Sequence, residues 1–182
     1  MVPFFALSSA QCIGFSGSRS PKGLLPPGVI FGAIAAIPKS ALVIVGCARG
    51  VDAIVRSALG SQCQVFSVAS GQFGSGRGAF AARSVACVRA VAEKGGLWVS
   101  FPCRACPAGL LPSASSSRCF CGTGSGSWAS LAFALGSGVP CLVFSPRGVP
   151  SGWGLSPVPD AEGWFGCGRV LGSPATAQLS LF

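Results

Sequence analysis

The sequence predicts an α/β protein: a Rossmann-like three-layer domain in which helices cover both faces of a mainly parallel sheet. Short apolar runs alternate with segments of helical character, which is typical of βαβ units. Half of the residues are hydrophobic and only 9% are charged, as expected where strands are buried on both faces. A chain of 182 residues is long enough to form one such domain with a substantial core.

Apolar runs place the strands, and the residues that flank them place the helices. The first strand breaks into a glycine turn, and Pro27 suits the first turn of the helix that follows. Asp52 is typical of the first turn of a helix, and Gly60 is typical of the position where a helix ends. We expect strands at 12–19, 41–48, 63–69, 97–101 and 140–145, a short strand near 118–122, and helices at 26–38, 49–60, 79–94 and 127–138.

Regular patterning stops after Pro146. Residues 147–177 are rich in glycine and proline and have no clear period, so we interpret them as an irregular linker. The chain then divides into a domain over 1–146, this linker, and a short tail over 178–182.

The apolar composition would suit a membrane protein, but the order of the residues argues against a membrane span and against a metal site. The apolar stretches at 24–38 and 128–144 are interrupted by proline or glycine, so we expect no membrane span and no membrane partner. No secretory signal is evident, and we expect a cytoplasmic location with reduced cysteines. The CxxC and CxC pairs within 103–121 include one spacing tighter than usual zinc ligands, and histidine is absent. We therefore expect no metal and no cofactor.

Positive charge and glycine turns point to a phosphate ligand. Thirteen Lys and Arg against four Asp and Glu give a formal charge of +9, which favours anionic partners. In open α/β sheets the ligand crevice lies beyond the carboxyl ends of the strands, where glycine turns at 17–19, 46–50, 74–78 and 124–127 are expected. Backbone N–H groups in such turns can approach an anion, and arginine can hold two phosphate oxygens.

Four segments also resemble a known family. They are GFSGSRSP (14–21), VIVGCARGVDAIVRSAL (43–59), RSVACVRAVAEKGGLWVSFP (83–102) and GSGSWASLAFALGSGVPCLVFSP (124–146). Their order and spacing over residues 12–146 resemble the DNA-processing protein A family (DprA/Smf), within the SMF/DprA-LOG Rossmann superfamily. This resemblance implies a DprA-like Rossmann domain over 1–146 whose glycine-rich edge binds the phosphates of single-stranded DNA.

Site residues follow from the turns and from matching positions. The expected phosphate or nucleic-acid contacts are Gly17, Ser18, Arg19, Gly46, Arg49, Gly50, Asp52, Arg77, Gly124, Ser125, Gly126 and Ser127. For Asp52, support of the start of its helix is an equally good alternative. The chain departs from the family at Phe101, where an acidic residue is usual, and at SASSSR (113–118), which replaces an arginine-asparagine-arginine element.

A second branch of the superfamily hydrolyses nucleoside monophosphates with a glutamate one helical turn after its glycine loop. The matching position here is Ser130. The chain has only four acidic residues and no histidine, which leaves few groups for acid–base chemistry. We therefore expect no enzymatic activity and no catalytic residue.

The tail QLSLF (178–182) resembles the pentapeptide by which bacterial replication and repair proteins bind the β sliding clamp. Leu181 and Phe182 would fill an apolar pocket while Gln178 hydrogen-bonds at its rim, with Leu179 and Ser180 between them. A final strand that caps the sheet is the alternative.

Together these observations predict a DNA-processing protein that binds single-stranded DNA or nucleic-acid phosphates and is recruited to the β sliding clamp. The alternative is a sensor of a small nucleotide, of the SLOG type; a nucleoside monophosphate phosphoribohydrolase is the least favoured function. A second copy of the chain, in a homo-oligomer, is a further candidate partner.

Overall fold

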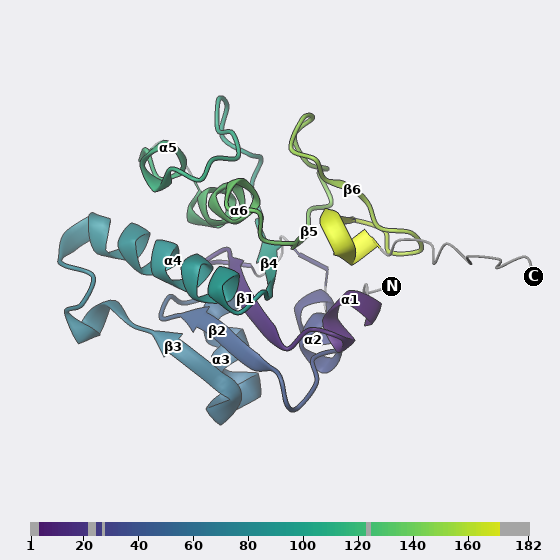
Figure 1. Ribbon diagram of the computed structural model, residues 1–182, viewed down its shortest axis with the longest axis horizontal. Helices are drawn as coiled ribbons and strands as arrows, with labels where there is room; N and C mark the ends of the chain where they lie inside the picture. The colour runs from purple at the N-terminus through teal and green to yellow at the C-terminus, as the bar shows by residue number, and fades with distance from the viewer. Residues whose placement is uncertain (1–3, 22–24, 27, 123–124, 172–182) are drawn as a thin grey trace, which may run out of the picture.

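The computed structural model describes residues 4–21, 25–26, 28–122 and 125–171, and these form a mixed sheet covered by helices (Figure 1). The sheet order is β3-β2-β1-β4-β5-β7-β6. Its strands are β1 (Cys12–Gly17), β2 (Leu42–Gly46), β3 (Cys63–Phe66), β4 (Leu97–Phe101), β5 (Cys141–Phe144), β6 (Ser156–Pro157) and β7 (Trp164–Gly166). The pairs from β3 to β5 are parallel, and β7 pairs antiparallel to both β5 and β6.

Helices lie on both faces of this sheet. They are α1 (Phe4–Ser8), α2 (Val29–Ala35), α3 (Val51–Leu59), α4 (Gly76–Glu93), α5 (Ser116–Cys119) and α6 (Gly126–Gly136), with 3-10 turns η1 (Gly60–Gln62), η2 (Val68–Ser70) and η3 (Gly168–Leu171). One core cluster joins the sheet to α1, α2 and α3, and the other joins it to α4, α5 and α6. The predicted Rossmann-like three-layer α/β fold is confirmed.

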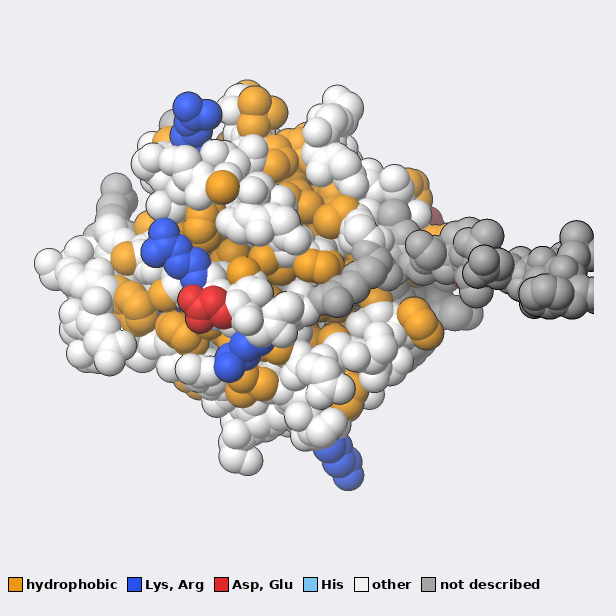
Figure 2. Space-filling model, in the orientation of Figure 1, with side chains coloured by type: hydrophobic (Ala, Val, Ile, Leu, Met, Phe, Trp, Pro, Cys, Tyr) orange, Lys and Arg blue, Asp and Glu red, His pale blue; other side chains and the backbone are white. Residues whose placement is uncertain are grey.

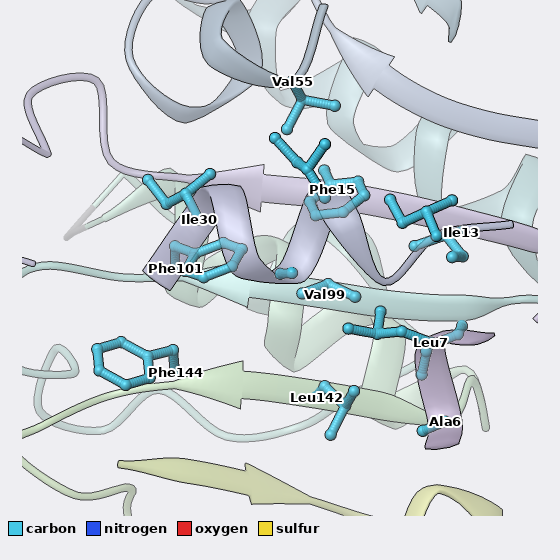
Figure 3. Packing of buried hydrophobic residues seen from close by; sticks show 14 of the residues in the cluster. Ala6, Leu7, Ile13, Phe15, Ile30, Val55, Val99, Phe101, Leu142 and Phe144 are labelled. Carbon is cyan, nitrogen blue, oxygen red and sulfur yellow. The ribbon is translucent and has the colours of Figure 1, made fainter. Parts of the chain in front are cut away.

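Strand burial explains the continuous apolar runs of the sequence. Every residue of β4 and β5 is buried, because helices cover these strands on both faces. Figure 3 shows Ile13 and Phe15 of β1 beside Val99 and Phe101 of β4 in the first of these clusters. The aromatic rings of Phe15 and Phe101 are stacked, with centroids 6.4 Å apart.

The strand order creates a switch in the direction of winding. The chain runs outward from β1 through β2 to β3, and then returns to the other side of β1 to form β4 and β5. In folds of this kind the loops after the two central strands diverge and leave a crevice at their carboxyl ends. Here that position lies between the loops that follow β1 and β4.

The structure differs from the sequence expectation at two places. Residues 116–119, close to the short strand expected near 118–122, form the helical turn α5. The segment 147–177, expected to be an irregular linker, carries β6 and β7 and η3 within its described part, so the sheet does not end at β5. Strands of two and three residues between glycine turns have no detectable period, but Trp164 anchors this segment in the core.

No helix within the described residues is long and apolar enough to span a membrane.

The role of Trp164 can be tested by truncation. Its ring packs edge-on against Phe101 at 5.5 Å and Phe144 at 5.4 Å, measured between centroids. Trp164→Ala should therefore lower the free energy of unfolding by about 4 kcal/mol in urea titrations, through lost burial and a cavity. Phe31→Ala is the matched control, because Phe31 is 60% exposed and its loss should cost no more than about 0.5 kcal/mol. Equal effects of the two variants would contradict the assignment of 147–171 to the folded domain.

Candidate functional site

A cleft of about 780 Å³ opens at the carboxyl edge of the parallel strands. The loops after β1, β2 and β4 line it, together with the amino-terminal parts of α4 and α6. Nine of the residues expected at the site line this cleft: Gly17, Ser18, Arg19, Gly46, Arg49, Asp52, Ser125, Gly126 and Ser127. The fold thus brings together turns that are far apart in the sequence.

Not every expected residue lines the cleft. Gly50 lies directly behind the loop of Ser18 and is absent from the cleft surface. The side chain of Arg77 and the whole of Gly124 lie outside the described residues, as does the expected clamp-binding segment Gln178, Leu179, Ser180, Leu181 and Phe182. Gly78, next to Arg77, does line the cleft.

Close packing of two loops sets the shape of the rim. Gly50 has φ +77°, and a Cβ atom at this position would overlap the carbonyl oxygen of Ser18. The same oxygen accepts a hydrogen bond from Val51 N at 3.1 Å, so the start of α3 is fastened to the loop after β1. Ser18 N in turn donates to the carbonyl oxygen of Phe101 at 3.0 Å. The loops after β1, β2 and β4 are therefore tied together by their backbones.

Two exposed arginines stand on this rim. Arg19 places its guanidinium carbon 4.8 Å from the centre of the Phe80 ring, within the range of a cation–π contact. Arg49 is exposed and lies in the loop between β2 and α3. Both side chains line the cleft, so an anion in it would meet guanidinium groups from two different loops.

Asp52 has a structural role inside the cleft wall. Its buried carboxylate accepts hydrogen bonds at Oδ2 from Arg83 Nη1 at 3.0 Å and from Ala48 N at 3.3 Å. Burial raises the pKa of Asp52 above its usual value, and the Arg83 guanidinium opposes that rise. These contacts tie the carboxylate to the loop after β2 and to α4.

Arg83 was not singled out from the sequence, yet it lies at the base of the cleft. It is only 7% exposed, and its Nη2 donates to Ser84 Oγ at 3.2 Å. Its Nε atom is buried and has no hydrogen-bond partner among the described residues. One feature of the sequence could have identified Arg83: it lies one helical turn from both Phe80 and Cys87, on the apolar face of the helix.

Positive charge exceeds negative charge beneath the cleft. Arg56 donates from Nη1 to the carbonyl oxygens of Gly46 and Ala48, the latter at 3.1 Å, while Arg83 is paired with Asp52. Two guanidinium groups therefore surround one carboxylate. This excess favours an anion in the cleft, because buried charge is costly unless it is compensated.

The first turn of α6 supplies the opposite wall. Oγ atoms of Ser125 and Ser127 are 2.7 Å apart, and Ser130 Oγ donates to the carbonyl oxygen of Gly126 at 2.8 Å. Free backbone N–H groups and the helix dipole favour an anion at such a helix start. The hydroxyl of Ser130 is therefore bonded to its own helix.

A hydroxyl network connects this turn to the sheet. Ser100 Oγ donates to the carbonyl oxygen of Ser127 at 3.4 Å, and Ser16 Oγ donates to Ser100 Oγ at 3.0 Å. Trp98 Nε1 donates to Ser16 Oγ at 3.2 Å. These buried serines were also missed, because serine within an apolar strand gives no functional signal by itself.

The thiols of the cleft are poorly suited to nucleophilic chemistry. Burial raises the pKa of Cys103 and Cys119, and it raises the pKa of Cys87 to about 12. Within the described parts of the chain, no group of three or more His, Cys, Asp or Glu side chains is placed to hold a metal ion.

The buried pair can be tested by comparing single and double substitutions. Asp52→Asn should lower the free energy of unfolding at neutral pH by about 3 kcal/mol, because Arg83 is left as an uncompensated buried cation. The double variant Asp52→Leu/Arg83→Met removes both charges and should lose less stability than Asp52→Asn. Glu93→Gln, at an exposed acid of α4, is the control and should be nearly neutral. A double variant less stable than the single one would contradict the charge argument.

Comparisons with known proteins assign no family to this cleft. No family model, no curated protein and no solved structure matches the chain.

Proposed function

We propose that the chain binds the phosphates of single-stranded DNA in this cleft and acts as a DNA-processing binding protein. The observation that supports this proposal is the convergence of glycine turns, Arg19, Arg49 and the start of α6 on one cleft at the switch point of the sheet. This combination of backbone N–H groups and guanidinium groups is suited to phosphate oxygens.

Exposure of the rim favours a polymer as the ligand. Arg19 and Arg49 are exposed, so they can contact a backbone that continues beyond the cleft. Phe80 lines the same cleft and offers an aromatic ring near these charges, and aromatic rings stack on the bases of single strands. On the face seen in Figure 2, the basic side chains of the described residues stand apart from one another.

A sensor of a small nucleotide is the second candidate. The buried Arg83 and the hydroxyl network beneath the cleft favour it, because such groups could hold a single enclosed phosphate. Salt dependence separates the two functions: binding of a DNA strand should weaken steeply with salt, and binding of one nucleotide should weaken less. We propose a binding function without chemistry, because Asp52 is the sole acidic residue of the described lining and is engaged by Arg83.

The DNA-binding proposal predicts a change in both affinity and salt dependence. The double variant Arg19→Ala/Arg49→Ala should weaken binding of a labelled oligothymidylate at least about tenfold, through loss of charged hydrogen bonds. The slope of log K against log salt should become shallower by about one for each arginine removed. Fluorescence anisotropy over a salt series measures both quantities.

Lys39→Ala is the matched control, because Lys39 is exposed in the turn before β2, at the opposite edge of the sheet. It should leave affinity and slope almost unchanged. An equal loss in both variants would mean that overall charge, and not the cleft, drives binding.

We also propose that QLSLF (178–182) recruits the protein to the β sliding clamp. The chain contains the complete pentapeptide pattern, and two apolar side chains beside a glutamine suit a pocket with a polar rim. A short tethered motif would raise the local concentration of the cleft at DNA without a new contact.

Leu181→Ala/Phe182→Ala should abolish capture of the full chain by an immobilised β clamp and should leave oligothymidylate affinity intact. The control is Leu111→Ala, a 66% exposed leucine outside the pentapeptide, which should retain clamp capture. Clamp binding that survives the double substitution would exclude the tail as the recruiting element.

A further inference from the structure

Two cysteines face each other across the antiparallel pair β5–β7. The register pairs Leu142 with Gly166, which sets Cys141 opposite Cys167, and Cys167 N donates to the carbonyl oxygen of Cys141 at 3.1 Å. Opposed residues of such a hydrogen-bonded pair have Cα atoms about 5.5 Å apart. This separation lies within the range that a disulfide spans.

The two thiols lie on the same face of the sheet. Both residues pack in the core cluster that joins the sheet to α4, α5 and α6. The register of the two strands places their side chains next to each other, and Cys141 Sγ donates to the carbonyl oxygen of Val139 at 3.1 Å. No rearrangement of the strands is needed to bring them together.

The two thiols differ in burial and in pKa. Cys141 is fully buried, whereas Cys167 is half-buried. Interaction with the neighbouring Cys141 side chain lowers the pKa of Cys167 to about 7, against the effect of burial. Burial raises the pKa of Cys141, as it does for Cys12, Cys63, Cys87, Cys103, Cys106 and Cys119. Cys167 thus combines thiolate character with access, the two properties that direct oxidation to a cysteine.

We propose that Cys141 and Cys167 are a redox-sensitive modification site that closes to a disulfide between β5 and β7 when the protein meets a peroxide. The Cys167 thiolate attacks hydrogen peroxide and becomes a sulfenic acid, and the displaced hydroxide takes up a proton to give water. The Cys141 sulfur then attacks Cys167 Sγ and releases the second water. Two thiols and one peroxide give one disulfide and two waters, a transfer of two electrons.

The position of the pair separates this site from the cleft. Cys141 is the first residue of β5, so the pair lies at the edge of the sheet opposite the carboxyl ends that form the cleft. The disulfide would close the chain between β5 and β7 into a loop, which restricts the unfolded state. We expect the oxidised protein to melt at a higher temperature and to bind oligothymidylate as the reduced protein does.

The test uses the full chain, treated with a stoichiometric amount of hydrogen peroxide and then alkylated. The tryptic peptide 148–169 contains Cys167 and no other cysteine, whereas peptide 119–147 contains Cys119, Cys121 and Cys141. Chymotryptic cleavage after Phe133 separates Cys141 from the other two. Mass spectrometry should then identify a disulfide-linked pair of fragments that carry Cys141 and Cys167, and its rate of formation should rise as pH increases through about 7.

Variants distinguish this pair from general oxidation. Cys63→Ser, at another half-buried thiol, should leave the crosslink intact, and Cys167→Ser should abolish it. Cys141→Ser should stop the reaction at a Cys167 sulfenic acid that reacts with dimedone. The proposal is overturned if Cys167 joins a different cysteine, if it proceeds to sulfinic acid in the unsubstituted chain, or if Cys141 remains alkylatable after Cys167 has been consumed.

Discussion

The site depends on two positions, Gly46 and Gly50, where there is no room for a side chain. Gly50 lets the loop after β2 lie directly against the carbonyl oxygen of Ser18, and Gly46 leaves room for the guanidinium of Arg83 beside the end of β2. A methyl group at Gly50 would separate loops that now share backbone hydrogen bonds, and one at Gly46 would displace the Arg83 guanidinium. The cleft therefore follows from close backbone approach, and Arg19 and Arg49 face one volume as a consequence.

Electrostatics beneath the cleft follow from the same packing. Because Asp52 accepts from both Arg83 and the amide of Ala48, its negative charge is used in holding the loop after β2. Arg56 binds the carbonyl oxygens of that loop and brings a second positive charge without a second carboxylate. The cleft wall is thus held by hydrogen bonds and carries an excess of positive charge, which favours an anion in the cleft.

The sequence predicted the parallel sheet well, because strands buried on both faces produce uninterrupted apolar runs with clear glycine stops. It also predicted the turns that meet at the cleft, since carboxyl ends of parallel strands share one edge. It could not predict Arg83, whose importance depends on packing against Asp52, 31 positions away in the sequence. Nor could it predict β7, because three residues have no period, and the pairing with β5 and the burial of Trp164 appear only in the folded chain.

The added strand β7 also supports the site from behind. Trp164 packs against Phe101, and the carbonyl oxygen of Phe101 accepts the hydrogen bond from Ser18 N that fixes the loop carrying Arg19. The ring of Phe101 is fully buried between Phe15 and Trp164. A carboxylate there would be desolvated without a partner, at a cost of several kcal/mol (about 3 or more). The apolar residue at this position and the antiparallel extension of the sheet are thus parts of one packing arrangement that keeps the rim of the cleft in place.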